Sequence, residues 1–477
     1  MHLLFILREV DNEPQGILLI SSVLKAAGHR TSLVVATQED PLVAARRLRP
    51  DVVGYSVYTG TQKYYLSLNR QIKEALPGIF SIFGGPHATF FPEIIYEPGV
   101  DAVCIGEGEY ATLDLLNALE DGKSPEGIAN WWIKRNGEVQ RNLLRPLLTE
   151  AELDALPFPD RELLYSAHPV SRRTRIRPVI TGRGCPYNCS FCFNKAYSDL
   201  YAGGKRVRQR TVTSVLSEIR AVRDEYGLDF VTFMDDTFIV NGAWLREFCT
   251  RYAAEIGIPW WCQVRADLVD DEKLRLLKSA GCVSVSFGLE AGNDRLRNEV
   301  LNRHMSREEI LRASSLLRRH GIAFSTNNML GLPTGGLAAD FETLDLNIQC
   351  RPDYANVFLY QPYPKTRLGE MAFANGLMEG SFDSLSGSVS EGTVIRFSSL
   401  SEKRQIENLQ KLLAITVEFP WLRGLVKQLI KLPPNPLFWF VYKVWKGYAM
   451  NRRLFPIRLG PLEYLRIALQ YMRIRSQ

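Results

Sequence analysis

Apolar and polar positions alternate along the first 130 residues in two periods. Five short apolar runs predict buried strands, and the stretches between them carry apolar residues at helical spacing. Near-continuous apolar strands separated by helices are typical of a parallel sheet covered on both faces, so we predict an α/β domain. The expected strands are 3–7, 31–36, 52–57, 79–83 and 102–105, and the expected helices lie near 15–27, 41–48, 61–76, 88–96 and 109–121.

Residues 171–395 repeat this alternation in six strand–helix units. A closed eight-fold barrel typically needs about 250 residues. We therefore predict a partial, TIM-like (β/α)6 barrel. The expected strands are 177–184, 229–236, 260–267, 282–290, 323–331 and 355–364, and the expected helices lie near 212–226, 243–256, 271–280, 306–320 and 338–349.

A linker and a tail complete the predicted organisation. Residues 131–170 contain Asn136-Gly137, a two-residue hairpin turn. Pro157, Pro159 and Pro169 then interrupt regular structure. Residues 396–477 have helical patterns. The predicted parts are thus 1–130, 131–170, 171–395 and 396–477.

Glycine-rich and polar segments follow the predicted strands. Gly84-Gly85-Pro86-His87 and Gly106-Glu107-Gly108-Glu109 come directly after strands of the first domain, where glycine lets a ligand approach the backbone. In a barrel, functional residues gather at the carboxyl ends of the strands. The strand ends of the second domain carry a cysteine cluster and the candidates Asp235, Asp236, Arg265, Glu290, Asn327 and Gln361. Surface solvation is the alternative interpretation of the two aspartates.

Three of the eight cysteines crowd into one loop with the spacing Cys185-x-x-x-Cys189-x-x-Cys192. An iron–sulfur cluster usually takes four thiolates, and three would leave one iron open to a substrate or cofactor. The alternative is a structural zinc site, although zinc usually binds four protein ligands in paired spacing. The other five cysteines are isolated in apolar segments, where we expect small buried hydrophobes.

With the aromatic Phe191 before the third cysteine, this run resembles the signature of the radical S-adenosylmethionine (SAM) superfamily, over about residues 171–395. The resemblance implies a [4Fe-4S] cluster whose open iron binds the amino and carboxylate groups of SAM. It implies reductive cleavage of SAM to methionine and a 5′-deoxyadenosyl radical that abstracts hydrogen from a substrate. Cys185, Cys189 and Cys192 are the expected catalytic and metal-binding residues.

Other barrel residues resemble SAM-binding positions of the superfamily. Glu290 and Arg303 resemble contacts to the amino-acid portion, with a helix cap or surface ion pair as the alternative. Gly331 begins a Gly-Leu-Pro motif that resembles one beside the adenine. Gln361 opens a sixth-strand motif in which Lys365 replaces the usual glycine, so a positive φ at this position would be strained.

Residues 1–130 resemble the Rossmann-like (flavodoxin-like) cobalamin-binding domain that precedes the barrel in one branch of the superfamily. The Asp-x-His-x-x-Gly run that supplies a cobalt-ligating histidine in other such domains is missing. The resemblance therefore implies base-off cobalamin without a protein histidine, and His29 is expected at the surface. A domain that binds no cobalamin is the alternative. The cofactor-binding candidates are Ser56, Gly84, Gly85, Pro86, His87 and Glu107.

The C-terminal tail is strongly basic, whereas the rest of the chain is mildly acidic. The net charge is +6, but residues 421–477 contain eleven Lys and Arg against the single acid Glu463, so the tail carries +10 and the rest −4. A mildly acidic body argues against nucleic acid as a partner. The basic and aromatic stretch 431–455 suits an anionic membrane surface. The alternative is a helix across the barrel opening with snorkelling lysines.

We expect a cytoplasmic protein, peripherally membrane-associated if the tail binds lipid. Cysteines are sparse, the start does not resemble a signal peptide, and no apolar run reaches about 18 residues.

These features predict a cobalamin-dependent radical SAM methyltransferase that acts on an unactivated carbon of a small or lipid-like molecule. The expected protein partner is a one-electron reductant such as flavodoxin or ferredoxin. One alternative is a radical SAM cyclase or oxidoreductase of the same branch that transfers no methyl group. A non-catalytic cobalamin or metal sensor is another. An RNA methylthiotransferase would need three more cysteines, and the first domain contains only Cys104.

Overall fold

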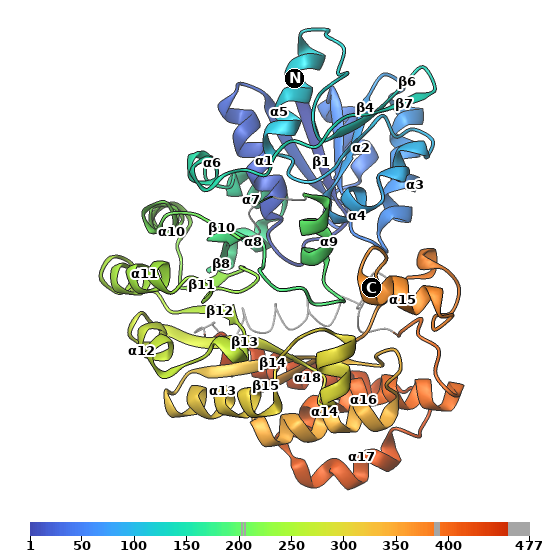
Figure 1. Ribbon diagram of the computed structural model, residues 1–477. Helices are drawn as coiled ribbons and strands as arrows, with labels where there is room; N and C mark the ends of the chain where they lie inside the picture. Colours follow the sequence, from blue (N-terminus) through green and yellow to red (C-terminus); the bar gives the residue numbers. More distant parts are fainter. Residues whose placement is uncertain (202–203, 205–206, 386–391, 457–477) are drawn as a thin grey trace. The chain divides into compact units, whose positions relative to one another are not determined.

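The structure is a computed structural model that describes the chain except residues 202–203, 205–206, 386–391 and 457–477. The chain forms two compact units (Figure 1). The first comprises residues 1–175 with 201–205, and the second comprises residues 176–200 with 206–477.

The first unit contains a seven-stranded sheet in the order β2-β1-β3-β4-β5-β6-β7. Strands β1 to β5 are parallel, and the β6–β7 hairpin adds to β5 in antiparallel orientation. The five predicted strands of this domain are confirmed. The strands are β1 (His2–Leu7), β2 (Arg30–Val35), β3 (Val52–Ser56), β4 (Phe80–Gly84), β5 (Ala102–Cys104), β6 (Trp131–Arg135) and β7 (Glu138–Arg141).

Helices cover both faces of this sheet (Figure 1). α2 and α3 share an apolar core with alternate strand residues such as Val53, whereas α1 packs with α5 on the opposite face. Asp40 caps α2, because its carboxylate accepts from the amides of Leu42 and Val43. The helices are α1 (Gln15–Ala26), α2 (Pro41–Leu48), α3 (Gln62–Ala75), α4 (Gly85–Phe90), η1 (Pro92–Tyr96) and α5 (Glu109–Glu120).

The segment predicted as a linker belongs to the first unit. The hairpin expected at Asn136-Gly137 pairs with β5 and so extends the sheet. Ser21 of α1 donates to Asp160 at 2.5 Å, which ties the following helices back to the sheet domain. These helices are α6 (Glu150–Ala155), α7 (Arg161–Ala167) and α8 (Pro169–Arg173).

The second unit contains a six-stranded parallel sheet in the order β8-β11-β12-β13-β14-β15. The predicted partial barrel is confirmed, since six strands follow one another and β8 and β15 form open edges. The strands are β8 (Ile176–Val179), β11 (Phe230–Phe233), β12 (Trp260–Val264), β13 (Cys282–Glu290), β14 (Ala323–Leu330) and β15 (Tyr354–Leu359), with a separate pair β9 (Gly182–Arg183) and β10 (Arg208–Gln209).

Alternate strand side chains point outward into a core shared with the surrounding helices. Phe233, Trp260 and Phe287 are fully buried there. The five helices expected between the strands are present. The helices are α9 (Phe193–Leu200), α10 (Val212–Tyr226), α11 (Gly242–Glu255), η2 (Ala266–Leu268), α12 (Asp271–Ser279), η3 (Leu296–Val300), α13 (Arg307–Arg319), α14 (Leu337–Cys350), α15 (Arg367–Ala374) and η4 (Phe382–Ser384).

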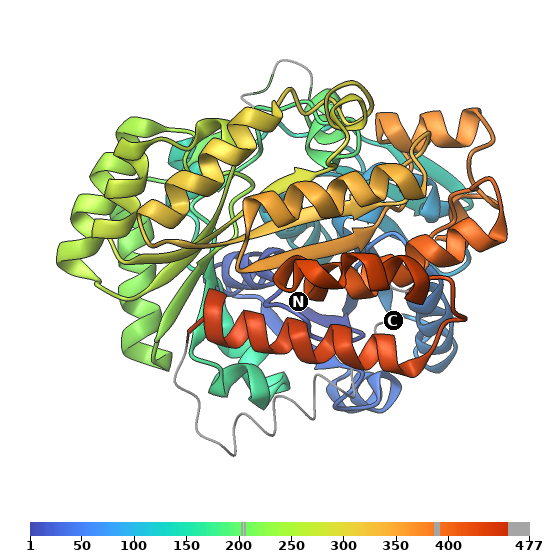
Figure 2. The same cartoon turned by 90° about the horizontal axis from the view of Figure 1, so that it is seen from below.

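The tail packs on the barrel unit, in part against the amino ends of its strands. α16 contacts β15 and α14, and α18 packs along α16 (Figure 2). At the start of β13, Ser284 donates to the carbonyl of Leu454 at 2.5 Å. The ring of Phe455 packs edge-on against Phe230 and Trp261, at centroid distances of 5.5 and 5.8 Å. The tail elements are α16 (Leu400–Glu418), η5 (Pro420–Leu422), α17 (Arg423–Leu429), α18 (Pro436–Ala449) and η6 (Met450–Leu454).

Candidate functional site

The three clustered cysteines lie in the loop between β9 and α9, beyond the carboxyl end of β8. Cys189 is buried, and Cys185 and Cys192 are half-buried. Burial, together with the charges of Asp236, Cys189 and Cys185, raises the pKa of the Cys192 thiol to about 12, and a hydrogen bond with the Asn194 backbone opposes this shift. The three sulfurs therefore lie within electrostatic reach of one another, and as thiolates they would need positive charge between them.

The cysteine loop is fixed by backbone and ring contacts within the barrel unit. Ser190 donates its amide to the carbonyl of Leu301 at 3.1 Å, and Asn302 donates to the carbonyl of Asn188 at 2.7 Å. Between the first two cysteines, the Tyr187 ring lies under the guanidinium of Arg265, whose Cζ is 3.5 Å from the ring centroid. This stack holds the loop against the end of β12.

Arg265 is itself held from two sides. Its Nε and Nη2 donate to the two carboxylate oxygens of Asp267 at 3.0 and 3.1 Å, and Nη2 also donates to the carbonyl of Arg303 at 2.9 Å. Its buried Nη1 has no hydrogen-bond partner among the described residues. A buried guanidinium with an unsatisfied donor beside the cysteine loop is suited to an anionic group of a ligand.

Glu290 and Arg303 lie together at the same strand ends. Arg303 donates to the carbonyl of Gly288 at 2.8 Å, and its Nη2 is 3.7 Å from Glu290 Oε1. Its Nη1 is 3.5 Å from the sulfur of Cys189. Burial raises the pKa of the Glu290 carboxyl, and Arg303 and Arg265 oppose this shift. Glu290 has φ +65°, a left-handed conformation of the kind found at functional sites.

The two aspartates after β11 have different environments. Asp235 is buried and accepts from both the amide and the hydroxyl of Thr181, the latter at 2.7 Å. Burial raises the pKa of Asp235 to about 6, and the Thr181 hydrogen bonds oppose the shift. Asp236 is exposed and interacts with Asn194 and the backbone of Gly184. Thus Asp235 anchors the strand that leads into the cysteine loop.

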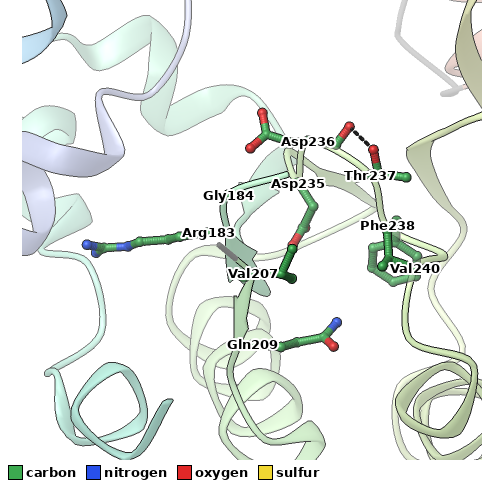
Figure 3. Close-up of a pocket in the computed structure, with 10 residues that line it drawn as sticks. Arg183, Gly184, Val207, Gln209, Asp235, Asp236, Thr237, Phe238 and Val240 are labelled. Atoms are coloured by element: carbon green, nitrogen blue, oxygen red, sulfur yellow. Dashed lines mark hydrogen bonds between the residues drawn. The ribbon is translucent and has the colours of Figure 1, made fainter. Parts of the chain in front are cut away.

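Both aspartates line a small pocket next to this loop (Figure 3). Figure 3 shows Asp236 and Thr237 at one rim, where the Thr237 hydroxyl donates to the Asp236 carbonyl at 2.7 Å. The same hydroxyl is 3.9 Å from the sulfur of Cys185. The lining residues are Gly182, Arg183, Gly184, Val207, Gln209, Asp235, Asp236, Thr237, Phe238 and Val240.

Asn327 and Gln361 lie at adjacent strands of the same sheet. Asn327 is half-buried and accepts from Asn356 of β15 at 3.2 Å. Gln361 is buried and donates to the carbonyl of Gly392 at 2.6 Å, while its Oε1 has no partner among the described residues. The predicted strain at Lys365 is confirmed, because this residue has φ +63°.

Gly331 has φ +71°, and its amide donates to both carboxylate oxygens of the buried Asp340, at 3.2 and 3.1 Å. Burial raises the pKa of Asp340 well above its usual value. The Gly-Leu-Pro turn is therefore anchored from α14. This contact was not predictable from the sequence, since Asp340 lies among ordinary helix-start residues.

The chemistry of the donor set suits a [4Fe-4S] cluster with one open iron. The loop supplies three thiolates, one for each of three irons, whereas a structural zinc ion usually takes four protein ligands. Across the part of the chain that the structure describes, no three His, Cys, Asp or Glu side chains converge as ligands of one ion.

Glycine-rich turns form the corresponding edge of the first unit. Gly85 has φ +88°, and a Cβ at this position would lie 2.9 Å from Ser56 Oγ. His87 is buried, its ring stacks on Phe91, and Nδ1 lies 3.1 Å from the Thr59 hydroxyl. Ser56, Gly84, Gly85 and the exposed Pro86 thus lie together where β3 and β4 end.

Two residues of this unit have structural roles. Glu107 accepts from the amide of Leu148 at 2.8 Å, which ties the turn after β5 to the following segment. The surface position predicted for His29 is wrong. His29 is buried, and its ring nitrogens lie 2.9 Å from Asn117 Oδ1 and 3.3 Å from the amino terminus.

Family comparisons agree with this geometry. Residues 179–338 match the model of the radical SAM superfamily, and residues 1–116 match that of the B12-binding domain. This chain belongs to the radical SAM superfamily, in the branch with an N-terminal B12-binding domain. It is a cobalamin-dependent radical SAM enzyme, with a [4Fe-4S] cluster, SAM and cobalamin as cofactors.

Two curated relatives and two solved structures resemble this radical SAM enzyme. It is 29% identical to the uncharacterized methyltransferase PH0819 of Pyrococcus horikoshii, over 76% of this chain and 79% of the relative. It is 29% identical to the anaerobic magnesium-protoporphyrin IX monomethyl ester cyclase of Rubrivivax gelatinosus, over 74% of this chain and 64% of the cyclase.

The structure of OxsB, a cobalamin-dependent SAM radical enzyme, matches 100% of this chain and 75% of its own, with a TM-score of 0.68 and 16% identity. The methyltransferase TsrM of Kitasatospora setae matches 80% of this chain and 77% of its own, with a TM-score of 0.64 and 17% identity. These likenesses support the fold of the radical SAM enzyme.

Proposed function

We propose that this radical SAM enzyme methylates an unactivated carbon of a small molecule. The observation that carries the proposal is the presence of a three-cysteine barrel and a B12-binding domain in one chain. PH0819, which the chain resembles over most of both lengths, is named a methyltransferase. The cytidylyl-2-hydroxyethylphosphonate methyltransferase of Streptomyces wedmorensis is also similar, at 27% identity over 62% of this chain.

Cys185, Cys189 and Cys192 would hold the cluster, which supplies the electron that cleaves SAM and leaves one iron for the SAM amino-acid portion. The surrounding residues would position that portion. Arg265 Nη1, which is buried without a partner among the described residues, is suited to the SAM carboxylate, and Glu290 offers an acceptor for the SAM ammonium group. Asp236, Asn327, Gly331 and Gln361 would border the adenosine and the substrate.

The edge of β3 and β4 would receive cobalamin, which carries the methyl group. Ser56, Gly84, Gly85 and Pro86 would contact it through short side chains and backbone. His87 directs its ring towards Phe91 and Thr59, which supports cobalamin binding without a histidine ligand from this turn. Glu107 would support the neighbouring turn, since its carboxylate fixes the backbone at Leu148.

A cyclase or oxidoreductase activity is the second candidate. The similarity to the Rubrivivax gelatinosus cyclase over 74% of this chain favours it. The two activities differ in product mass. Methyl transfer adds a methyl group in place of a hydrogen, whereas oxidative ring closure removes hydrogen.

The test uses anaerobically reconstituted enzyme with a reductant, cobalamin and SAM that carries a trideuterated methyl group. We expect 5′-deoxyadenosine and label transfer to candidate substrates. A Cys189→Ala variant should form neither product, whereas Cys350→Ala, in a buried thiol of α14, should retain both. Formation of 5′-deoxyadenosine with an unlabelled, oxidised product would contradict methyl transfer and favour the cyclase.

We also propose a reductant and a cellular location for this enzyme. A flavodoxin or ferredoxin would supply single electrons in a cytoplasmic setting. No helix within the described ranges is long and apolar enough to cross a membrane.

A further inference from the structure

Helix α18 is apolar on two sides. Its inner side packs on the barrel unit through the buried residues Phe438, Tyr442 and Ala449. The opposite side carries a second apolar stripe that is exposed. Leu437, Phe440, Val444 and Tyr448 form this stripe, with exposed fractions of 64, 54, 50 and 46%.

The spacing makes the stripe continuous. At about 100° per residue, positions 437, 440, 444 and 448 fall within an arc of roughly 80° on the helix. Single exposed apolar residues are ordinary on a protein surface, whereas a row of four along one helix marks an interaction surface. The residues that lead into α18 continue the apolar character, since Leu432 is 47% exposed.

The charge beside this stripe is positive only. Residues 421–456 contain seven Lys and Arg and no acidic residue. Two of the seven, Arg423 and Arg453, form ion pairs with Asp345 and Glu418. Lys443 borders the stripe beside Phe440 and lies over the ring of Trp439 at 5.9 Å, whereas Lys446 lies over the buried Tyr442 at 5.7 Å, towards the inner side of the helix.

We propose that the exposed stripe of α18 (Leu437, Phe440, Val444 and Tyr448) binds an anionic lipid surface. Apolar residues on one arc, with the Tyr448 ring among them and Lys443 at their border, match a helix that lies in the membrane interface. The 14 residues of α18 suit an interfacial helix and are too few to span a bilayer. Anionic headgroups would complement the lysines. This surface would bring the enzyme to lipid-like substrates, independently of which reaction it catalyses.

Vesicle flotation of the full-length protein tests this inference. We expect recovery with phosphatidylcholine vesicles that contain phosphatidylglycerol, and less recovery with phosphatidylcholine alone or in high salt. Phe440→Ser with Val444→Ser should weaken the partition coefficient at least about tenfold, because each buried apolar side chain contributes more than the free energy of one decade. Leu143→Ser, at an 86% exposed leucine of the first unit, is the matched control.

Three outcomes would overturn the inference. One is equal recovery with and without anionic lipid, and another is a double variant that floats like the wild type. The third is loss of self-association or of thermal stability in the double variant without vesicles. This result would show that a second copy of the chain or its own residues cover the stripe. None of these readouts depends on methyl transfer.

Discussion

The guanidinium of Arg303 lies 3.5 Å from the sulfur of Cys189. Its other terminal nitrogen donates to the carbonyl of Gly288 at 2.8 Å, and Glu290 lies 3.7 Å away. A single arginine thus joins Cys189, a proposed cluster ligand, to the end of β13. Groups that contact metal ligands in this way commonly change metal affinity or activity by 10–100-fold when they are removed.

Arg303→Gln should therefore lower SAM cleavage about 10–100-fold. A positive charge near Cys189 would stabilise the reduced, more negative state of a bound cluster, so its loss should also shift the reduction potential of the cluster to lower values. Iron content, an EPR-monitored reduction titration and 5′-deoxyadenosine formation measure these effects. Arg319→Gln, at an exposed arginine of α13, is the control. An unchanged potential with full activity would contradict this role.

The stack of Arg265 on Tyr187 predicts a second effect. Tyr187→Leu should loosen the cysteine loop, because a desolvated cation–π contact contributes about 2 kcal/mol. We expect faster loss of the cluster in air, followed by the decay of its visible absorbance. Tyr187→Phe keeps the ring and should decay like the wild type. Equal decay in all three proteins would show that the stack does not hold the loop.

Lys365 has φ +63°, which glycine adopts without steric cost. Lys365→Gly should therefore increase the free energy of unfolding by about 1 kcal/mol. Lys365→Ala keeps the Cβ and should show no such gain. Thermal and denaturant unfolding of the three proteins measure the difference. A gain in the alanine variant, or none in the glycine variant, would mean that the backbone is not strained here.

Asp235 should make stability depend on pH. Its pKa is raised by burial to about 6 in the folded protein from the usual value near 3.8. Between these values the folded state holds a proton that the unfolded state has lost. The contribution of Asp235 is therefore fully present below pH about 4, and it is lost as the pH rises to about 6, on the order of 3 kcal/mol.

The Asp235→Asn variant tests whether the carboxyl of Asp235 lowers stability as the pH rises. The amide can still accept from the Thr181 amide and donate to its hydroxyl, and it does not ionise. Relative to the wild type, the variant should gain stability between pH 4.5 and 7.5 in denaturant titrations. Asp224→Asn, at an exposed carboxylate, should follow the wild type. If instead the wild type gains stability relative to Asp235→Asn as the pH rises over this range, the carboxyl is not protonated in the folded protein.

Apolar periodicity predicted the strands and helices of both domains, because the burial of regularly spaced apolar side chains determines where those elements form. The cysteine spacing and the strand-end polar residues predicted a group of residues that the structure brings together, among them Cys189, Glu290 and Arg303. The stack of Tyr187 on Arg265 and the anchor of Thr181 on Asp235 were not predictable in this way, since each depends on the register between strands. His29 was misplaced because its partner Asn117 lies 88 residues away.

The contacts of the tail, too, could be predicted from the sequence only in part. Its sequence predicted helices and left two alternatives open, a membrane surface or a cover across the barrel opening. The structure places Leu454 and Phe455 against the starts of β13 and β11, while the outer stripe of α18 stays exposed. Helix α18 thus packs on the barrel with one side and leaves its other side exposed to solvent.

The ring of Phe455 packs on Phe230 and Trp261 at the amino ends of β11 and β12, the opposite ends of these strands from those that lead to Asp235 and Arg265. Truncation of the chain before Phe455 would expose apolar surface of these two side chains, so a lower melting temperature of the barrel unit is the expected result.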